Sequence, residues 1–198
     1  LRNQKVPASA ITLSTAGARV TSATQIEAGV GADKVSLPAY CKVLGSIAAA
    51  DPTAPPIQFE LDLPGTWNKK LLMLGGGGFN GTVPNTAGNV PAGPYDRPVP
   101  LARGYAVVGS DSGHQAPKTP QAPLKPGMDA SFALNAEALR NYTGEALKKV
   151  HDAALHLIRM RYGVRPDKAY FAGGSTGGRE ALEVVQRWPD DWDGAIAW

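Results

Sequence analysis

The residues best suited to chemistry in this sequence surround Ser175, which lies in the glycine-rich run from Gly173 to Gly178. A serine spaced from two glycines as G-x-S-x-G is typical of the sharp strand-to-helix turn that exposes a nucleophile. Small residues two positions before and after the serine leave room for its strained backbone, and the start of the following helix offers free N–H groups to a developing oxyanion. The pattern therefore predicts a nucleophilic serine. A glycine-rich turn that merely joins a strand to a helix is the alternative.

A second glycine run, from Gly75 to Gly81, directly follows an apolar segment at 71–74. Its spacing also matches the G-x-G-x-x-G of dinucleotide-binding domains, but that site needs a helix to open at the last glycine. The prolines and glycines from Pro84 onward exclude such a helix, so we reject the nucleotide site. A glycine loop after an early strand can instead bring a backbone N–H close to a substrate carbonyl, as in lipases and esterases. A flexible loop without function is the remaining alternative.

Two further polar residues, Asp111 and His114, follow an apolar segment at 105–108. Because sites in open α/β sheets lie at the carboxyl ends of the strands, we expect both side chains to line the site. The two residues would form a triad with Ser175, yet the usual order in α/β-hydrolases is nucleophile, then acid, then histidine. A structural pair of Asp111 and His114 that shapes its own loop is therefore the favoured interpretation.

Four continuous apolar segments precede or follow these motifs, and such segments are typical of strands buried on both faces in a parallel sheet. They lie at 71–74, 105–108, 169–172 and 195–198. Helical spacing of apolar residues predicts helices at about 142–162 and 178–188 between them, so strands and helices alternate as in an α/β fold. Strict alternation at 57–63 predicts a strand with one wet face, and the first 50 residues contain only short β pieces, such as 40–44.

The composition fits one globular domain and excludes several classes of protein. The 198 residues carry a net charge of only +3 and the basic residues are scattered, so no nucleic-acid partner is expected. No run of about 18 apolar residues occurs, so no membrane-spanning helix is expected. The single cysteine, Cys41, excludes a disulfide framework within the chain and a multi-cysteine metal site. Glycine (23) and proline (17) form a fifth of the chain, which disfavours a helical bundle.

Taken together, the motifs resemble the tannase and feruloyl esterase family, whose members include mono(2-hydroxyethyl) terephthalate hydrolase. The matching segments are 37–43, 75–81, 104–114 and 173–180. The resemblance implies an α/β-hydrolase core over residues 1–198, with a mostly parallel sheet and helices on both faces. Within it, 1–50 form an irregular or β segment, and 51–198 carry the core strands, the oxyanion loop and the nucleophile turn. The resemblance also implies a lid domain after residue 198. Because no histidine follows Ser175 and the sequence stops within an apolar run, we expect it to be the first part of a longer hydrolase.

The family's site residues transfer to the matching positions. The resemblance implies Ser175 as the nucleophile, with the backbone N–H groups of Thr176 and of Gly77 or Gly78 as oxyanion donors. The catalytic aspartate and histidine, most of the acyl pocket and a structural calcium site are implied to lie in or beyond the lid. We therefore expect no metal ligands in this chain and no cofactor for catalysis. The residues expected to contact the substrate are Phe79, Asp111 and His114.

Two positions depart from the family pattern. Many members carry a cysteine before the nucleophile, bonded to one beside the catalytic histidine, and Gly174 replaces it here. We interpret this as a clade without the bond rather than as a loss of activity. Cys41 resembles a family cysteine whose partner lies near the mature N-terminus, and we expect that partner upstream of Leu1. Such a disulfide, like the family itself, implies a secreted or periplasmic protein.

The sequence therefore predicts a secreted serine carboxylesterase that hydrolyses esters of aromatic or phenolic acids through an acyl-enzyme on Ser175. Gallate, ferulate, other hydroxycinnamates and terephthalate monoesters all remain open as acyl groups. The alternative is a catalytically incomplete fragment, or one chain of a processed two-chain enzyme whose second chain carries the lid, the aspartate and the histidine. A nucleotide-binding domain is the third and weakest alternative.

Overall fold

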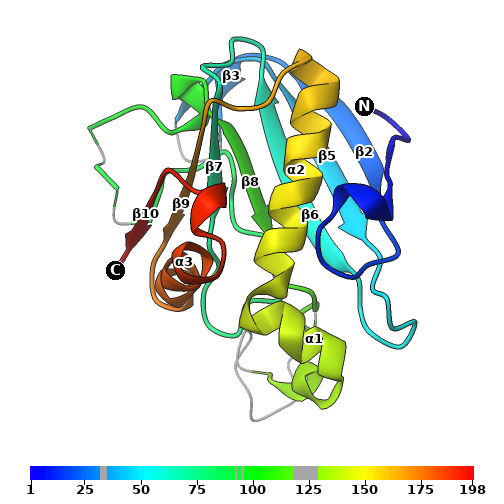
Figure 1. Ribbon diagram of the computed structural model, residues 1–198. Helices are drawn as coiled ribbons and strands as arrows, with labels where there is room; N and C mark the ends of the chain where they lie inside the picture. Colours follow the sequence, from blue (N-terminus) through cyan, green and yellow to red (C-terminus); the bar gives the residue numbers. More distant parts are fainter. Residues whose placement is uncertain (32–34, 92, 95, 118–128) are drawn as a thin grey trace.

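One eight-stranded sheet runs through the computed structural model, which describes residues 1–31, 35–91, 93–94, 96–117 and 129–198 (Figure 1). The strands lie in the order β1-β2-β5-β6-β8-β7-β9-β10. A separate two-stranded ribbon pairs β3 (Gly29–Val30) with β4 (Ser36–Leu37). The bounds of the strands in the large sheet are β1 Lys5–Val6, β2 Ala18–Ile26, β5 Tyr40–Ile47, β6 Ile57–Pro64, β7 Lys70–Leu74, β8 Ala106–Ser110, β9 Lys168–Gly173 and β10 Gly194–Ala197.

Two long helices connect the later strands. The helix α2 (Ala146–Tyr162) joins β8 to β9, and α3 (Thr176–Arg187) joins β9 to β10. This alternation of strands and helices confirms the predicted α/β fold. The shorter helical segments are η1 Ala8–Ala10, η2 Leu101–Arg103, η3 Ser131–Leu134, α1 Ala136–Arg140, the π-helical turn η4 Asn141–Glu145 and η5 Pro189–Asp191.

The strands β8, β7, β9 and β10 are parallel, as their continuous apolar runs predict. In the register, Leu71 of β7 pairs with Ala106 of β8 on one side and with Ala169 of β9 on the other. Because these strands run in the same direction, their carboxyl ends meet at one edge of the sheet. The two glycine runs and the loop that begins at Asp111 all leave the sheet at this edge.

The other half of the sheet is antiparallel. Its strand β6 pairs with β8, and β5, β2 and β1 follow in that order towards the edge of the sheet. The sequence predicts β6 and part of β5, but it does not reveal β2, which is nine residues long. Many positions of β2 hold threonine, serine or glutamine, and its register with β5 shifts between Val20 and Ser22. This irregularity interrupts the period of two from which strands are recognised.

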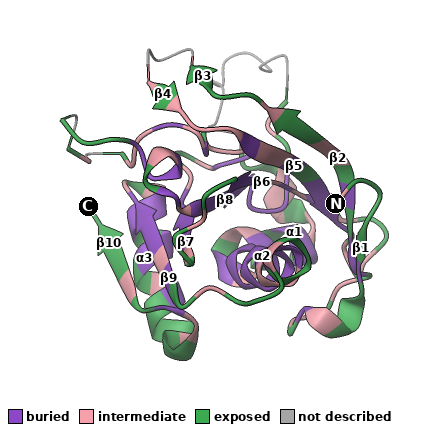
Figure 2. Ribbon diagram, turned by 90° about the horizontal axis from the view of Figure 1, so that it is seen from above, coloured by how far each residue is buried: buried purple, intermediate pink, exposed green. Residues whose placement is uncertain are grey.

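The main core lies between the sheet and the two long helices. The apolar positions of β6 point to this side and pack with buried residues of α2 and α3, such as Leu157 and Val184. Figure 1 shows α2 crossing in front of the sheet, and Figure 2 shows the sheet curving around that helix. In the described chain both long helices lie on this face, whereas the resemblance implies helices on both. The opposite face carries a smaller cluster that includes Leu72, Val107 and Leu101 of η2.

The structure differs from the sequence prediction in the start of the long helix and in the burial of the last strand. The long helix starts at Ala146 rather than at 142, because Thr143 and Gly144 leave helical geometry, Gly144 with φ 130°. A side chain at Gly144 would collide with Glu183, so this glycine lets the chain approach α3 closely. The apolar run at the end of the chain predicts a buried strand, but β10, which pairs only with β9 among the described strands, leaves Ile196 61% exposed.

Candidate active site

Ser175 occupies the strained turn between β9 and α3 that the sequence predicts. Its backbone angles are φ 55° and ψ −119°, a region that residues other than glycine rarely adopt. The side chain is exposed and stands at the first turn of α3. A β carbon on Gly173 would collide with the carbonyl of Gly177, and one on Gly177 would lie 2.8 Å from the carbonyl of Gly76, so both positions two residues from the serine must be small.

Three hydrogen bonds hold this turn against its neighbours. The Ser175 N–H donates to the carbonyl of Trp198 at 3.0 Å, and the Gly177 N–H donates to the carbonyl of Gly76 at 3.0 Å. The Thr176 hydroxyl donates to the carbonyl of Gly78 at 2.6 Å. The two glycine runs that the sequence singles out are therefore in direct contact, although about 100 residues separate them.

A pocket of about 540 Å³ opens beside Ser175. Within the described part of the chain, the backbone N–H groups of Thr176 and Gly77 have no backbone acceptor. Gly77 lines the pocket and Gly78 does not, so the geometry favours Gly77 of the two candidate oxyanion donors. The lining residues are Gly75, Gly76, Gly77, Thr82, Pro84, Pro91, Gly174, Ser175 and Trp198.

The position before the nucleophile has a structural reason to be glycine. A β carbon on Gly174 would collide with the indole nitrogen of Trp198. The indole thus occupies the space in which a cysteine at this position would place its side chain. Glycine at position 174, where many family members have cysteine, therefore leaves room for the Trp198 indole.

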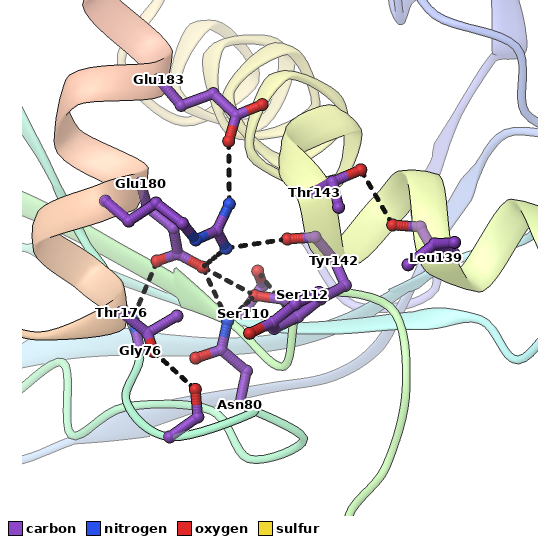
Figure 3. Close-up of polar contacts among 12 residues, drawn as sticks. Gly76, Asn80, Ser110, Ser112, Leu139, Tyr142, Thr143, Thr176, Glu180 and Glu183 are labelled. Atoms are coloured by element: carbon purple, nitrogen blue, oxygen red, sulfur yellow. Dashed lines mark hydrogen bonds and ion pairs between the residues drawn. The ribbon is translucent and has the colours of Figure 1, made fainter. Parts of the chain in front are cut away.

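A buried carboxylate that the sequence analysis missed lies beneath the two loops. Glu180 is 1% exposed and accepts hydrogen bonds from the Gly76 N–H at 3.0 Å and from Nδ2 of Asn80 at 2.6 Å (Figure 3). The Ser112 hydroxyl donates to the same carboxylate at 3.3 Å, so the loops after β7 and β8 meet on α3. Burial raises the pKa of Glu180, and these donors together with Arg179 oppose that shift. The sequence signal for this buried carboxylate is weak: a glutamate stands at a position of the predicted helix that faces the sheet.

Two residues of this network have positive φ angles without being glycine. Asn80 has φ 60° and Ser112 has φ 63°, and their side chains are joined by a hydrogen bond of 2.7 Å from Nδ2 to Oγ. Each such conformation costs on the order of 1–3 kcal/mol and persists only where surrounding contacts hold it. Together with Ser175, three strained residues lie around Glu180.

Asp111 shapes its own loop, but it does not pair with His114. Its Oδ1 accepts the N–H groups of Gln58 at 3.0 Å and Gly113 at 2.9 Å, and Nε2 of Gln115 donates to Oδ2 at 2.6 Å. Burial raises the pKa of Asp111 to about 6. The carboxylate has no contact with the His114 ring among the described interactions, so neither the pair nor the triad with Ser175 is formed.

His114 instead belongs to an aromatic cluster. Its ring stacks on Phe132 with centroids 3.7 Å apart, and it makes a hydrogen bond to the backbone of Phe79. Burial lowers the pKa of His114, which favours its neutral form. The ring of Phe79 contacts Tyr142 edge-on at 6.3 Å. None of Phe79, Asp111 and His114 is among the residues that line the pocket of Ser175, so their contact with substrate stays a prediction.

The described residues contain no group of three or more histidine, cysteine, aspartate or glutamate side chains placed to hold a metal ion. The calcium site that the resemblance implies concerns residues outside this chain. No helix in the described ranges is long and apolar enough to cross a membrane. Cys41 is a free cysteine in this structure.

Comparison with known proteins agrees with this geometry. A family model described as tannase and feruloyl esterase matches residues 41–198. The chain belongs to the tannase and feruloyl esterase family. It is 46% identical over 191 residues to an uncharacterised esterase of Agrobacterium fabrum, covering 96% of this chain and 33% of that protein. It is 32% identical over 173 residues to mono(2-hydroxyethyl) terephthalate hydrolase of Piscinibacter sakaiensis, covering 84% and 27%.

A solved structure of this family is also similar. The crystal structure of feruloyl esterase B from Aspergillus oryzae superposes with a TM-score of 0.70 at 27% identity, over 96% of this chain and 35% of that protein. The fold is therefore that of an α/β-hydrolase. The chain spans about a third of the length of the family members it matches.

Proposed function

We propose that the protein is a carboxylic ester hydrolase that works through an acyl-enzyme on Ser175. The observation that carries this proposal is the strained, exposed serine at the start of α3, beside a pocket that Gly77 also lines. The N–H groups of Gly77 and Thr176, which lack backbone acceptors among the described residues, are the proposed oxyanion donors. Family membership supports the same reaction class.

In the proposed reaction, Oγ of Ser175 attacks the ester carbonyl while a histidine base takes the hydroxyl proton. The carbonyl oxygen becomes an oxyanion, and the N–H groups of Thr176 and Gly77 stabilise it. Collapse of this intermediate breaks the ester bond and releases the alcohol, which receives the proton from the histidine. Water then attacks the acyl-enzyme in the same way, and the acid leaves as Ser175 regains its proton.

The base is proposed to come from a part of the full-length protein outside this chain. None of the three histidines lines the pocket of Ser175. His114 is stacked on Phe132, and His151 is buried on α2 beside Asp152. His156 lines a different pocket. A processed two-chain enzyme with the base on its second chain is the variant of this proposal that the sequence analysis also supports.

For the substrate we propose esters of aromatic or phenolic acids. The pocket walls come from the prolines Pro84 and Pro91, the Trp198 side chain and glycine backbone, which together suit a flat ring. The names of the relatives, a terephthalate monoester hydrolase and a feruloyl esterase, point to the same acid class. We further propose that the protein is secreted or periplasmic, as the family resemblance implies.

The test is the Ser175→Ala variant of the full-length protein. We expect its kcat for methyl ferulate, methyl gallate and 4-nitrophenyl esters to fall by more than about a thousandfold, because the acyl-enzyme cannot form. Its melting temperature should stay within a few degrees of wild type. Ser36→Ala, an exposed serine on β4, is the matched control and should keep full activity. Unchanged turnover in Ser175→Ala would refute the assignment of the nucleophile.

A further inference from the structure

Glu180 is a buried carboxylate at the centre of the site that the proposed reaction does not use. We propose that Glu180, through its hydrogen bonds to the Gly76 N–H and to Asn80, is a positioning residue that aims the N–H of Gly77 at the oxyanion. This inference rests on the proposed function. In this proposal α3 has two roles. It begins directly after Ser175, and its residue Glu180 holds the glycine loop at the distance that the oxyanion needs.

The partners of Glu180 all donate hydrogen bonds. Oε2 accepts the Gly76 N–H at 3.0 Å, and Oε1 accepts from Nδ2 of Asn80 at 2.6 Å and from the Ser112 hydroxyl at 3.3 Å. Because every partner donates, the geometry favours the ionised carboxylate. Among the described residues, Arg179 forms an ion pair with this carboxylate, its guanidinium lying 4.0 Å from Oε1.

The Gly76–Gly77 peptide connects this network to the reaction. Its carbonyl accepts the Gly177 N–H at 3.0 Å, and the preceding N–H, that of Gly76, is held by Glu180. In a planar trans peptide the N–H points opposite to the carbonyl. The Gly77 N–H therefore points away from Gly177, and Gly77 lies in the lining of the pocket beside Ser175. Two anchors on α3 thus set the direction of one proposed oxyanion donor.

The glycine loop at 75–81 is packed so closely that its backbone conformation is tightly restricted. A side chain on Gly76 would collide with the Asn80 amide, and Asn80 itself has φ 60°. Its amide donates to both Glu180 and Ser112, which is a second strained residue with φ 63°. The strained backbone persists because these hydrogen bonds hold it, so a change at Glu180 releases the loop.

The first experiment is Glu180→Gln in the full-length protein. The glutamine amide replaces one acceptor by a donor that faces other donors, so the loop must shift. We expect kcat to fall roughly ten- to hundredfold, as for a misplaced oxyanion donor, while KM changes less than about threefold, because the donor acts mainly in the transition state. The matched control is Glu137→Gln. Glu137 is 3% exposed and also accepts two backbone N–H groups, those of Ala50 and Asp51, so it should lower stability but not kcat.

The second experiment, Asn80→Asp, separates positioning from mere folding. It places a carboxyl group where an amide now lies 2.6 Å from Glu180, so the two carboxyl groups must share a proton. In acid the shared proton restores a hydrogen bond, and at higher pH both groups ionise and repel. We expect the kcat of the variant relative to wild type to fall at least tenfold between pH 5 and pH 8.

The outcomes are distinguishable. The positioning role is overturned if Glu180→Gln keeps the wild-type kcat. It is also overturned if the Asn80→Asp ratio is the same at every pH, because a structural defect alone does not follow the protonation of the pair. If wild type and Ser175→Ala are equally inactive towards all esters, the proposed function fails, and not the role of Glu180.

Discussion

At the level of single residues, buried carboxylates hold loops in this chain by accepting hydrogen bonds from backbone N–H groups. Glu180 holds Gly76, and Asp111 holds Gln58 and Gly113. A buried carboxylate is costly unless such donors compensate it, so each one marks a loop whose position matters. Asp62 differs from these, because its hydrogen-bond partner is the Thr86 hydroxyl, which also contacts the carboxyl group of Glu60.

The Thr86 hydroxyl lies 2.7 Å from Oδ2 of Asp62 and 2.7 Å from Oε1 of Glu60. One hydroxyl proton can serve only one of the two carboxyl groups at a time, and a proton on the other carboxyl group completes the hydrogen bonds between the three side chains. Asp62 is fully buried, and burial raises its pKa to about 7, whereas Glu60 forms an ion pair with Lys42 at 2.8 Å. The proton therefore belongs on Asp62.

This proton makes stability depend on pH. The folded pKa of Asp62 lies above the ordinary value of 3.8, so its contribution is fully present below about pH 4 and is lost as the pH rises towards about 7. Relative to Asp62→Asn, wild type should lose up to about 4 kcal/mol of unfolding free energy between pH 4 and pH 8. Urea unfolding of both proteins at several pH values measures this difference. Asp167→Asn, at an exposed position, is the control, and parallel curves for wild type and Asp62→Asn would contradict the prediction.

At the level of elements, the site depends on how closely α3 approaches β7 and β9. The glycines make this approach possible, since a β carbon on Gly75 or Gly177 would lie within 3 Å of the backbone of the other run. The backbone atoms that such a carbon would meet cannot move aside as a flexible side chain can. The distance between Ser175 and the glycine loop after β7 is therefore fixed by backbone contacts between elements.

A single methyl group should disturb this arrangement. Gly173→Ala places a β carbon against the carbonyl of Gly177, which is backbone at the start of α3. We expect the variant to lose about 1–3 kcal/mol of stability, as other overpacked sites do, and at least a hundredfold in kcat. Chemical denaturation and ester hydrolysis measure the two effects. Gly29→Ala, where no atom lies within 4 Å of the added carbon, should change neither. Wild-type kinetics in Gly173→Ala would show that the turn tolerates a shift of α3.

At the level of the whole molecule, the parallel strands bring the proposed nucleophile and the proposed oxyanion donors together, but none of the three histidines of this chain lines their pocket. The loops after β7 and β9 supply Gly77 and Ser175. The loop after β8 supplies Ser112, whose hydroxyl donates a hydrogen bond to Glu180. The histidines lie elsewhere, on the β8 loop and on α2. The described part of the chain therefore contains the proposed nucleophile and the proposed oxyanion donors, with no histidine beside them.

We accordingly predict that residues 1–198, prepared alone, turn over no ester faster than buffer does. An unactivated serine hydroxyl is a weak nucleophile at neutral pH, whatever the quality of the oxyanion hole. Hydrolysis of a 4-nitrophenyl ester by the purified piece, with folding checked by circular dichroism, tests this. Turnover that Ser175→Ala abolishes in the isolated piece would mean that a base is present within it.

Local patterns predicted much of this protein because local geometry imposes them. The strained turn at Ser175 needs small neighbours, and strands buried on both faces need unbroken apolar runs. Both requirements can be recognised in a few consecutive residues. The same holds for the glycine loop after β7, whose flanking prolines exclude a nucleotide-binding helix. The expected helices were found to within a few residues, apart from the start of α2 at the kink near Gly144.

Only the tertiary structure revealed β2, the separation of Asp111 from His114 and the hydrogen bonds of Glu180. In each case the decisive partner is distant in sequence: β2 is held by β5, Asp111 by Gln58, and Glu180 by Asn80, 100 residues away. A polar strand at the side of a sheet and a buried acid have no local signature, because neighbours brought together by folding satisfy their hydrogen bonds. The sequence by itself indicated that Ser175 lies in a strained strand-to-helix turn, and the tertiary structure decided which buried acid accepts hydrogen bonds from the glycine loop beside it.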